Sequence, residues 1–184
     1  AKNFDVEILP PHLNDSDRTF SVKNGKILFG LEAIKGIGSK FVDIIMEERE
    51  KKPYSSFNDF YKRTSPSVST VVALVKSGAI PCKSKYDFLL SFAKSLYKLK
   101  EYTDVKTLPK LSVLKEKYGI DGNVIKDKEE RLKLYNAQRR AEFHLAQKEK
   151  QKNEINSFVE KYMSNEKSWE FESLSVFITN NPFV

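Results

Sequence analysis

The sequence predicts a mainly α-helical protein with a small β-hairpin element at its N-terminus and a long helical extension. Residues 1–30 alternate apolar and polar side chains around an Asn-Gly pair, which favours a strand hairpin. From Leu31 onward the apolar residues recur at helical spacing, and glycine, proline and serine separate the runs. We therefore expect three regions: a β-hairpin segment over 1–30, paired helical hairpins over 31–100, and a helical extension over 101–184.

Two short stretches carry the β signal. The stretch "FDVEIL" (4–9) alternates apolar and polar residues and is stopped by Pro10-Pro11. The stretch "RTFSVKNGKILFG" (18–30) has alternating arms on either side of Asn24-Gly25, and both residues of such a turn need positive φ. This pattern predicts one strand followed by a hairpin.

The first helical periodicity is interrupted by a glycine-rich break. Leu31 and Ile34 are one helical turn apart, and Gly36-Ile37-Gly38 follows them. The next helix is expected to end near Lys51-Lys52-Pro53. Its apolar face is formed by Phe41, Ile44, Ile45 and Met46.

Capping residues define the next three helices. Residues 55–59, "SSFND", resemble a capped start for a short helix through Phe60, Tyr61 and Arg63. Residues 68–77 form another helix, closed by Gly78 where a left-handed cap is favoured. Ser84 and Asp87 begin a further helix over 85–100, "KYDFLLSFAKSLYKLK".

The remaining chain reads as an extension. We expect a short helix around 111–118 and turns at Gly119 and 121–123. Residues 127–163 read as one long helix or as two in series, because 147–154, "QKEKQKNE", lacks apolar residues. A final helix is expected through Trp169, Phe171, Leu174 and Phe177.

The composition favours an intracellular polyanion-binding protein. The net charge is +7 and is unevenly spread: residues 1–50 carry −2, residues 51–118 carry +9 and residues 119–184 carry 0. A basic block of this kind suggests nucleic acid as a partner, and a solvated helical surface is the alternative. The single Cys82 fits a reducing, cytoplasmic setting, and no run is long enough for a membrane span.

The break at residues 35–40, "KGIGSK", has the features of a phosphate-binding turn. The start of a helix leaves backbone N–H groups unpaired with partial positive charge, and glycine lets a phosphate approach without meeting a Cβ. Ile37 can point inward and join the two helices. The pattern is that of a helix-hairpin-helix, which contacts the DNA backbone without reading bases. The expected contacts come from Lys35, Gly36, Ile37, Gly38, Ser39 and Lys40.

A second break, at residues 64–69, lacks the glycine pair and is a weaker candidate. Lys62 and Arg63 beside it are further candidates for phosphate contacts. A solvated helix face explains them equally well.

Catalytic and metal-binding patterns are absent from the sequence. His12 and His144 lie far apart, and one cysteine cannot build a Cys/His metal site. A base-excision glycosylase uses a similar hairpin and places a catalytic Asp about twenty residues beyond it. Asp59 lies in that range, but the glycine-rich segment before it is missing. A protein–protein interaction module of a replication complex is the other alternative.

Several motifs resemble the alpha subunit of bacterial DNA polymerase III, the C-family replicative polymerase. They are "PPHLNDS" (10–16) before the hairpin, "FGLEAIKGIG" (29–38), Arg49 at a helix end, and Phe57 with Asp59-Phe60. "LVKSGA" (74–79) and the C-terminal "WEFESLSVFITNNPFV" (169–184) follow in the same order. The resemblance covers residues 4–92 and 166–184, whereas 100–165 corresponds to a segment that varies within the family. His12, Pro81-Cys82, Ser175 and Asn181 depart from the family pattern, as in a divergent, for example phage-encoded, lineage.

The resemblance implies a fragment that runs from the end of the fingers, through a tandem helix-hairpin-helix domain, toward an OB-fold. Such a fragment is non-catalytic and holds duplex primer-template DNA, while the palm with its Mg²⁺ site lies in another part of the polymerase. The remainder of the polymerase is then a partner. A sliding clamp is another, although the nearest clamp-like peptide, "QRRAEF" (138–143), has only Ala141 at its aliphatic position.

Overall fold

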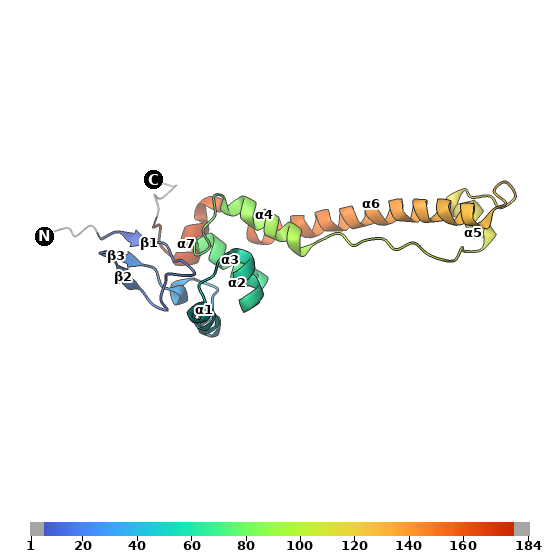
Figure 1. The fold of residues 1–184 in the computed structure, drawn as a ribbon. Helices are drawn as coiled ribbons and strands as arrows, with labels where there is room; N and C mark the ends of the chain where they lie inside the picture. The colour runs from blue at the N-terminus through green and yellow to red at the C-terminus, as the bar shows by residue number, and fades with distance from the viewer. Residues whose placement is uncertain (1–5, 179–184) are drawn as a thin grey trace. The chain divides into compact units, whose positions relative to one another are not determined.

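A computed structural model describes residues 6–178, and the chain forms two compact units. Unit 1 comprises Ala1–Phe92 and Glu160–Val184, and unit 2 comprises Ala93–Val159. Helices dominate, and the strands lie near the N-terminus (Figure 1), which confirms the predicted fold class. None of the helices within residues 6–178 combines the length and the apolar character that a membrane span requires. Residues 4–5 of the expected strand and 179–184 of the C-terminal motif lie outside the described part.

The strands form a three-stranded sheet in the order β1-β3-β2. The hairpin of β2 (Ser21–Lys23) and β3 (Lys26–Leu28) is confirmed, since Asn24 and Gly25 both have positive φ, 50° and 76°. The strand expected over 4–9 is shorter than predicted. It pairs as β1 (Ile8–Leu9) in parallel with β3, where Ile8 lies opposite Ile27 and Leu9 opposite Leu28.

The segment after β1 is fastened to the helices by polar side chains. The Asn14 amide accepts from the backbone N–H of Tyr54 and donates to its carbonyl, at 2.8 and 2.9 Å. The Arg49 guanidinium donates to the carbonyls of Leu13 and Ser16 at 2.9 and 2.7 Å. Because each of these bonds reaches over thirty residues along the chain, they fix the proline-rich segment against the helical part of unit 1.

Capping residues mark the starts of α2 (Phe57–Thr64) and α3 (Val68–Ser77) and the end of α3. α2 and α3 have Ser56 and Ser67 as N-caps, whose hydroxyls accept backbone N–H groups three residues on. Gly78 ends α3 at φ +88°. The predicted start and end of α3 are therefore confirmed.

Helical structure before the glycine break is shorter than the periodicity suggested. The chain forms one 3₁₀ turn, η1 (Leu31–Ala33), and Ile34 is already extended at φ −76°, ψ 117°. The Ile34 N–H donates to the Leu31 carbonyl. The next backbone N–H, that of Lys35, donates to the Ser173 carbonyl instead of continuing a helix. After the break α1 spans Ser39–Lys51, as expected.

The core of unit 1 lies between these elements. Its fully buried side chains come from η1, α1, α2, α3, α4 and α7, and include Leu31, Ile34, Val42, Ile45, Phe60, Val71, Leu74, Val75, Leu89 and Trp169. Phe57 contacts the rings of Phe60, Phe88 and Phe92 edge-on or tilted, with centroids 4.9 to 6.3 Å apart. These contacts pack α2 against α4 (Lys85–Leu96).

Two helix ends differ from the sequence prediction. α4 ends at Leu96 instead of Lys100, because the backbone beyond it bonds to glutamines of α6. The last helix, α7 (Trp169–Leu174), follows a 3₁₀ turn, η2 (Glu166–Ser168), and ends before Phe177. Ser175 takes the left-handed conformation at φ 61° and its N–H bonds to the Phe171 carbonyl, which stops the helix.

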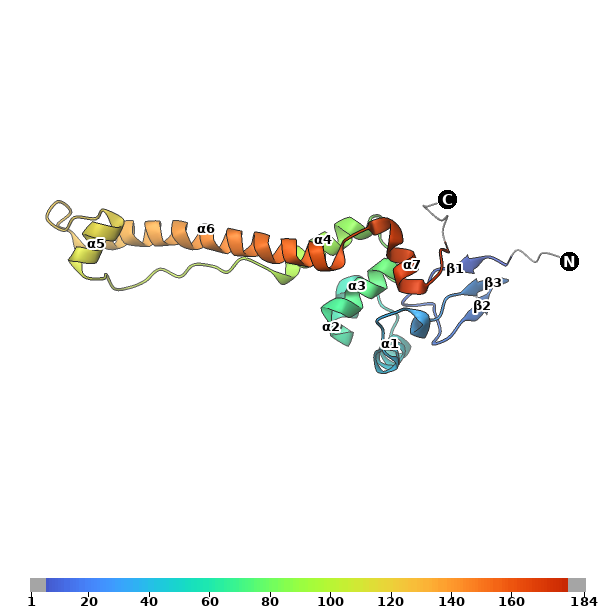
Figure 2. The ribbon, with the colours of Figure 1, turned by 180° about the vertical axis from the view of Figure 1, so that it is seen from behind.

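Unit 2 is built on the long helix α6 (Lys128–Tyr162), most of which it contains. The interpretation of one long helix is confirmed, and the alternative of two helices is wrong, since α6 continues through 147–154. The short helix α5 (Leu111–Tyr118) lies beside the start of α6 (Figure 2). Leu114, Tyr118 and Ile120 form its small core, with Leu108, Ile125 and Tyr135 packed against them.

Candidate nucleic-acid interface

The glycine break forms a tight turn into α1. Gly36 has φ +87°, a conformation that an L-residue adopts only at a cost, and Gly38 is the N-cap of α1 at φ −81°, ψ 150°. Ile37 between them is buried, with 8% of its surface exposed. Its side chain is therefore the apolar anchor of the turn, while both glycines are exposed.

Four backbone N–H groups of the turn point to no acceptor. Within residues 6–178, no hydrogen bond is made by the N–H groups of Gly36, Gly38, Ser39 or Lys40, whereas those of Phe41 and Val42 both bond to the Gly38 carbonyl. A Cβ placed on Gly38 would meet no atom within 4 Å. The turn thus presents unpaired donors at the positive end of α1, with free space beside Gly38.

Two lysines add positive charge at the same place. Lys35 and Lys40 are exposed on either side of the turn, together with Ser39. Neither ammonium forms an ion pair within the described chain. Unpaired cations around unpaired N–H groups form a site suited to an anion such as a phosphate.

The turn is also supported by a hydrogen bond to α7, which no sequence pattern predicts. The backbone N–H of Lys35 donates to the Ser173 carbonyl at 2.8 Å. Next to this bond, the Lys76 ammonium lies 5.1 Å from the centre of the Trp169 ring and 3.3 Å from the Glu172 carboxylate. The contact with Ser173 is made by main-chain atoms, so no side-chain pattern signals it.

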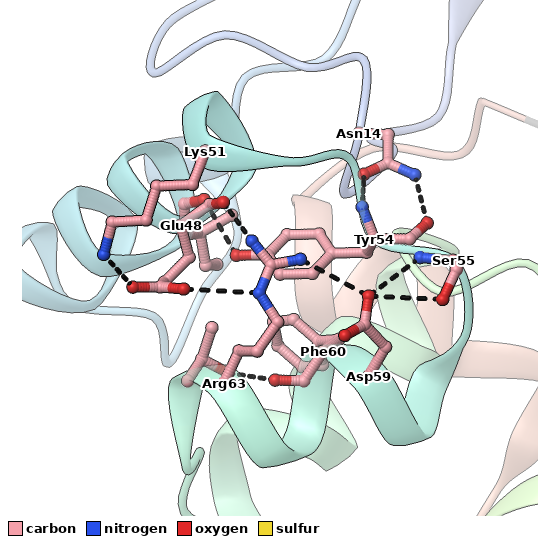
Figure 3. A network of polar contacts seen from close by, with 10 residues as sticks. Asn14, Glu48, Lys51, Tyr54, Ser55, Asp59, Phe60 and Arg63 are labelled. Atoms are coloured by element: carbon pink, nitrogen blue, oxygen red, sulfur yellow. Dashed lines mark hydrogen bonds and ion pairs between the residues drawn. The ribbon is translucent and has the colours of Figure 1, made fainter.

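Lys62 and Arg63 occupy different environments. Lys62 is exposed and has no ion-pair partner in the described residues. Arg63 instead holds α2 to α1: its guanidinium bonds to the side chain and carbonyl of Glu48, pairs with Asp59 at 3.3 Å, and lies 4.7 Å from the Tyr54 ring centre (Figure 3). Because its donors are used by Glu48 and Asp59, Arg63 stabilises the packing of α2 on α1. It is not included among the proposed phosphate contacts.

Asp59 acts as a helix cap. Its carboxylate accepts from the backbone N–H and the hydroxyl of Ser55, at 3.0 and 3.3 Å, and pairs with Arg63 (Figure 3). The bond from the Ser55 N–H, with the charge of Arg63, lowers the pKa of Asp59 below its ordinary value. A proton-abstracting base needs a free carboxylate with a higher pKa, so this geometry gives no support to the glycosylase alternative.

Comparison with known proteins places this turn in a recognised class. A model of the helix-hairpin-helix motif matches residues 5–86, which include the sheet, the turn and α1 to α3. This segment is therefore similar to the helix-hairpin-helix motif.

The relatives are more specific than the motif. The chain is 36% identical over 102 residues to DNA polymerase III subunit alpha of Chlamydia pneumoniae. It is 43% identical over 92 residues to that of Helicobacter pylori and 43% identical over 83 residues to that of Deinococcus radiodurans. These matches cover 53%, 44% and 43% of this chain but only 8%, 8% and 6% of the respective relatives. The resemblance to polymerase III alpha subunits is thus confirmed over about half of the chain.

Proposed function

We propose that this chain is a non-catalytic region of a replicative DNA polymerase and that it binds the phosphate backbone of duplex DNA. The observation that carries the proposal is the set of backbone N–H groups at the exposed residues Gly36, Gly38, Ser39 and Lys40, which make no hydrogen bond within residues 6–178. The similarity to DNA polymerase III alpha subunits supports the polymerase context.

Binding in this mode is independent of base sequence. Backbone N–H groups and lysines contact phosphate oxygens, and phosphates carry no direct base information. Lys35 and Lys40 add charge, and Lys62 is a weaker contributor from α2. Each neutralised phosphate releases counterions, so the affinity falls steeply as the salt concentration rises.

The chemistry of the parent polymerase is assigned to its other regions. In this proposal Mg²⁺ and the nucleotidyl transfer belong to a palm outside these residues, and primer-template DNA held at the hairpin extends from that palm. A sliding clamp is not included, because Gln138 of the clamp-like peptide lies inside α6 and donates to the Tyr118 carbonyl at 3.0 Å.

A fluorescence anisotropy titration with a labelled duplex tests the proposal. The Lys35→Glu/Lys40→Glu variant should bind at least about tenfold more weakly at low salt, because two cations are replaced by anions next to the phosphates. The control is Lys52→Glu/Lys83→Glu, an equal charge change at two exposed lysines of unit 1 that form no ion pair in the described chain.

The results of this titration distinguish DNA-backbone binding from the two alternative functions. A loss confined to the hairpin variant, equal for duplexes of unrelated sequence, supports backbone binding. Equal affinity of the hairpin variant and the control would overturn the role of the hairpin and favour a protein interaction module. Base release from DNA that is abolished by Asp59→Asn would favour the glycosylase alternative instead.

A further inference from the structure

The positive charge of the chain does not lie in the unit that holds the hairpin. Unit 1 has 16 Lys and Arg against 15 Asp and Glu, a net charge of +1. Unit 2 has 16 against 10, a net charge of +6. Most of the net charge of +7 is therefore carried by residues 93–159. The proposed binding of DNA by the hairpin does not explain this charge.

Part of this charge lies on a segment without helix or strand, residues 97–110, which we call the strap. The strap runs alongside α6 (Figure 1) and is bonded to it by amide side chains. Gln151 donates to the Tyr97 carbonyl at 2.8 Å, and Gln147 accepts from the Lys100 N–H at 3.4 Å. Further along, the buried Asn136 both donates to and accepts from the backbone of Val105, at 3.0 and 2.9 Å. The strap is thus held in one extended conformation.

The lysines of the strap are exposed and unpaired. Lys98, Lys100, Lys106 and Lys110 have no carboxylate within ion-pair distance in the described chain. Three other cations of unit 2 are ion-paired: Lys115 with Asp121 at 2.8 Å, Arg139 with Glu142 at 3.6 Å and Arg140 with Asp104 at 2.6 Å. Lys98 and Lys100 also line a hollow of about 230 Å³, with Lys150 of α6 on its other side.

We propose that the strap and the adjoining face of α6 form a second contact surface for the phosphate backbone of a nucleic acid. The charged groups are held along an extended line, as a polyanion with regularly spaced charges requires. An acidic protein surface fits less well, because lysine is depleted at the centre of protein interfaces. Since Lys98, Lys100 and Lys150 meet beside one hollow, they are the first residues assigned to the contact.

The choice of duplex DNA as the nucleic acid rests on the proposed function, but the contact itself does not use the hairpin. The test is the salt dependence of duplex binding by the full chain, measured by anisotropy. In Lys98→Gln/Lys100→Gln, the slope of log affinity against log salt should fall by about 1.8, since each lost phosphate contact removes about 0.9.

The matched control is Lys51→Gln/Lys115→Gln, which removes the same charge from two lysines that are ion-paired, with Glu48 and Asp121. Its slope should stay close to that of the unaltered chain. A strap variant with the slope of the control would overturn the inference while leaving the hairpin proposal intact. A hairpin variant without effect, beside a strap variant with one, would overturn the hairpin proposal alone. Tighter binding of poly-glutamate than of DNA, lost in the strap variant, would replace nucleic acid by an acidic protein and overturn the inference.

Discussion

The backbone N–H of Lys35 donates to the carbonyl oxygen of Ser173 at 2.8 Å, which joins the glycine turn to the last helix of the described chain. The bond directs this N–H away from the open side of the turn. It therefore separates two roles: the Lys35 N–H holds the turn, whereas the N–H groups of Gly36, Gly38, Ser39 and Lys40 make no hydrogen bond within residues 6–178.

The two glycines of the turn should respond differently to alanine. Gly36→Ala places a side chain at φ +87°, so the free energy of unfolding should fall by about 1–2 kcal/mol. Gly38→Ala meets no atom within 4 Å at a permitted φ of −81°, so stability should stay within about 0.5 kcal/mol. Its methyl group nevertheless occupies the path of a phosphate, and duplex binding should weaken. Urea unfolding and anisotropy measure both effects. Full DNA affinity in Gly38→Ala would contradict phosphate approach at this residue.

Ser175→Gly should stabilise the chain. Ser175 ends α7 at φ 61°, a conformation that costs an L-residue roughly 1–2 kcal/mol and glycine almost nothing. Allowing for the greater freedom of glycine in the unfolded chain, a gain of about 0.5–1 kcal/mol is expected.

Thermal unfolding measures this gain, and Ser91→Gly serves as its control. Ser91 is an exposed residue within α4, so glycine there should lower stability by about 0.5 kcal/mol. A loss of stability at both positions would show that the left-handed conformation of Ser175 is not strained.

Tyr54 should make stability depend on alkaline pH. Its hydroxyl donates to the Ile45 carbonyl at 2.9 Å in the core, and burial raises its pKa to about 12 from an ordinary value near 10. The folded chain keeps this proton to a higher pH than the unfolded chain does. The contribution of the protonated Tyr54 to the free energy of unfolding is therefore full below pH 10 and is lost as the pH rises from 10 to 12. At most this amounts to about 2.7 kcal/mol, at about 1.36 per pKa unit.

The Tyr54→Phe variant isolates this effect. At pH 8 it should be about 1 kcal/mol less stable, because the Ile45 carbonyl loses its donor. Between pH 10 and 12 the difference from the unaltered chain should shrink, since the variant has no proton to lose there. Denaturant unfolding at each pH gives both values. A difference that stays constant over this range would exclude Tyr54 as the titrating group.

Asn136→Ala should loosen the strap. The Asn136 side chain is 6% exposed and makes both hydrogen bonds to Val105, so its removal should cost about 1–2 kcal/mol. Amide hydrogen exchange at Val105 should accelerate accordingly. Asn153→Ala, an exposed residue of the same helix, should leave that exchange rate unchanged. Unaltered exchange at Val105 in the Asn136 variant would show that the strap is held by other contacts.

Elements with local signals could be predicted closely from the sequence. Asn24-Gly25 predicts the hairpin because its backbone requirement is local. Gly78 predicts the end of α3 for the same reason, because it takes the left-handed conformation. The buried position of Ile37 between exposed glycines also follows from its apolar character and its neighbours.

Features that depend on distant backbone atoms could not be predicted. The bond from Lys35 to Ser173, the parallel pairing of β1 with β3, and the termination of η1 all involve main-chain groups that any residue carries. The sequence places Arg63 among the DNA contacts because its charge alone does not show whether a partner such as Glu48 lies nearby. The assignment of the hairpin residues to DNA remains a prediction.

Unit 2 is an insertion within unit 1, because the chain leaves unit 1 after Phe92 and returns to it at Glu160. The acceptor for Lys35 lies beyond that return, in α7. A fragment that stops before residue 160 would therefore contain the whole motif yet lack the carbonyl that supports its turn. The inserted residues, in contrast, provide no hydrogen bond to the turn among those described. The hydrogen bonds of the turn therefore require the segment after the insertion, and not the insertion itself.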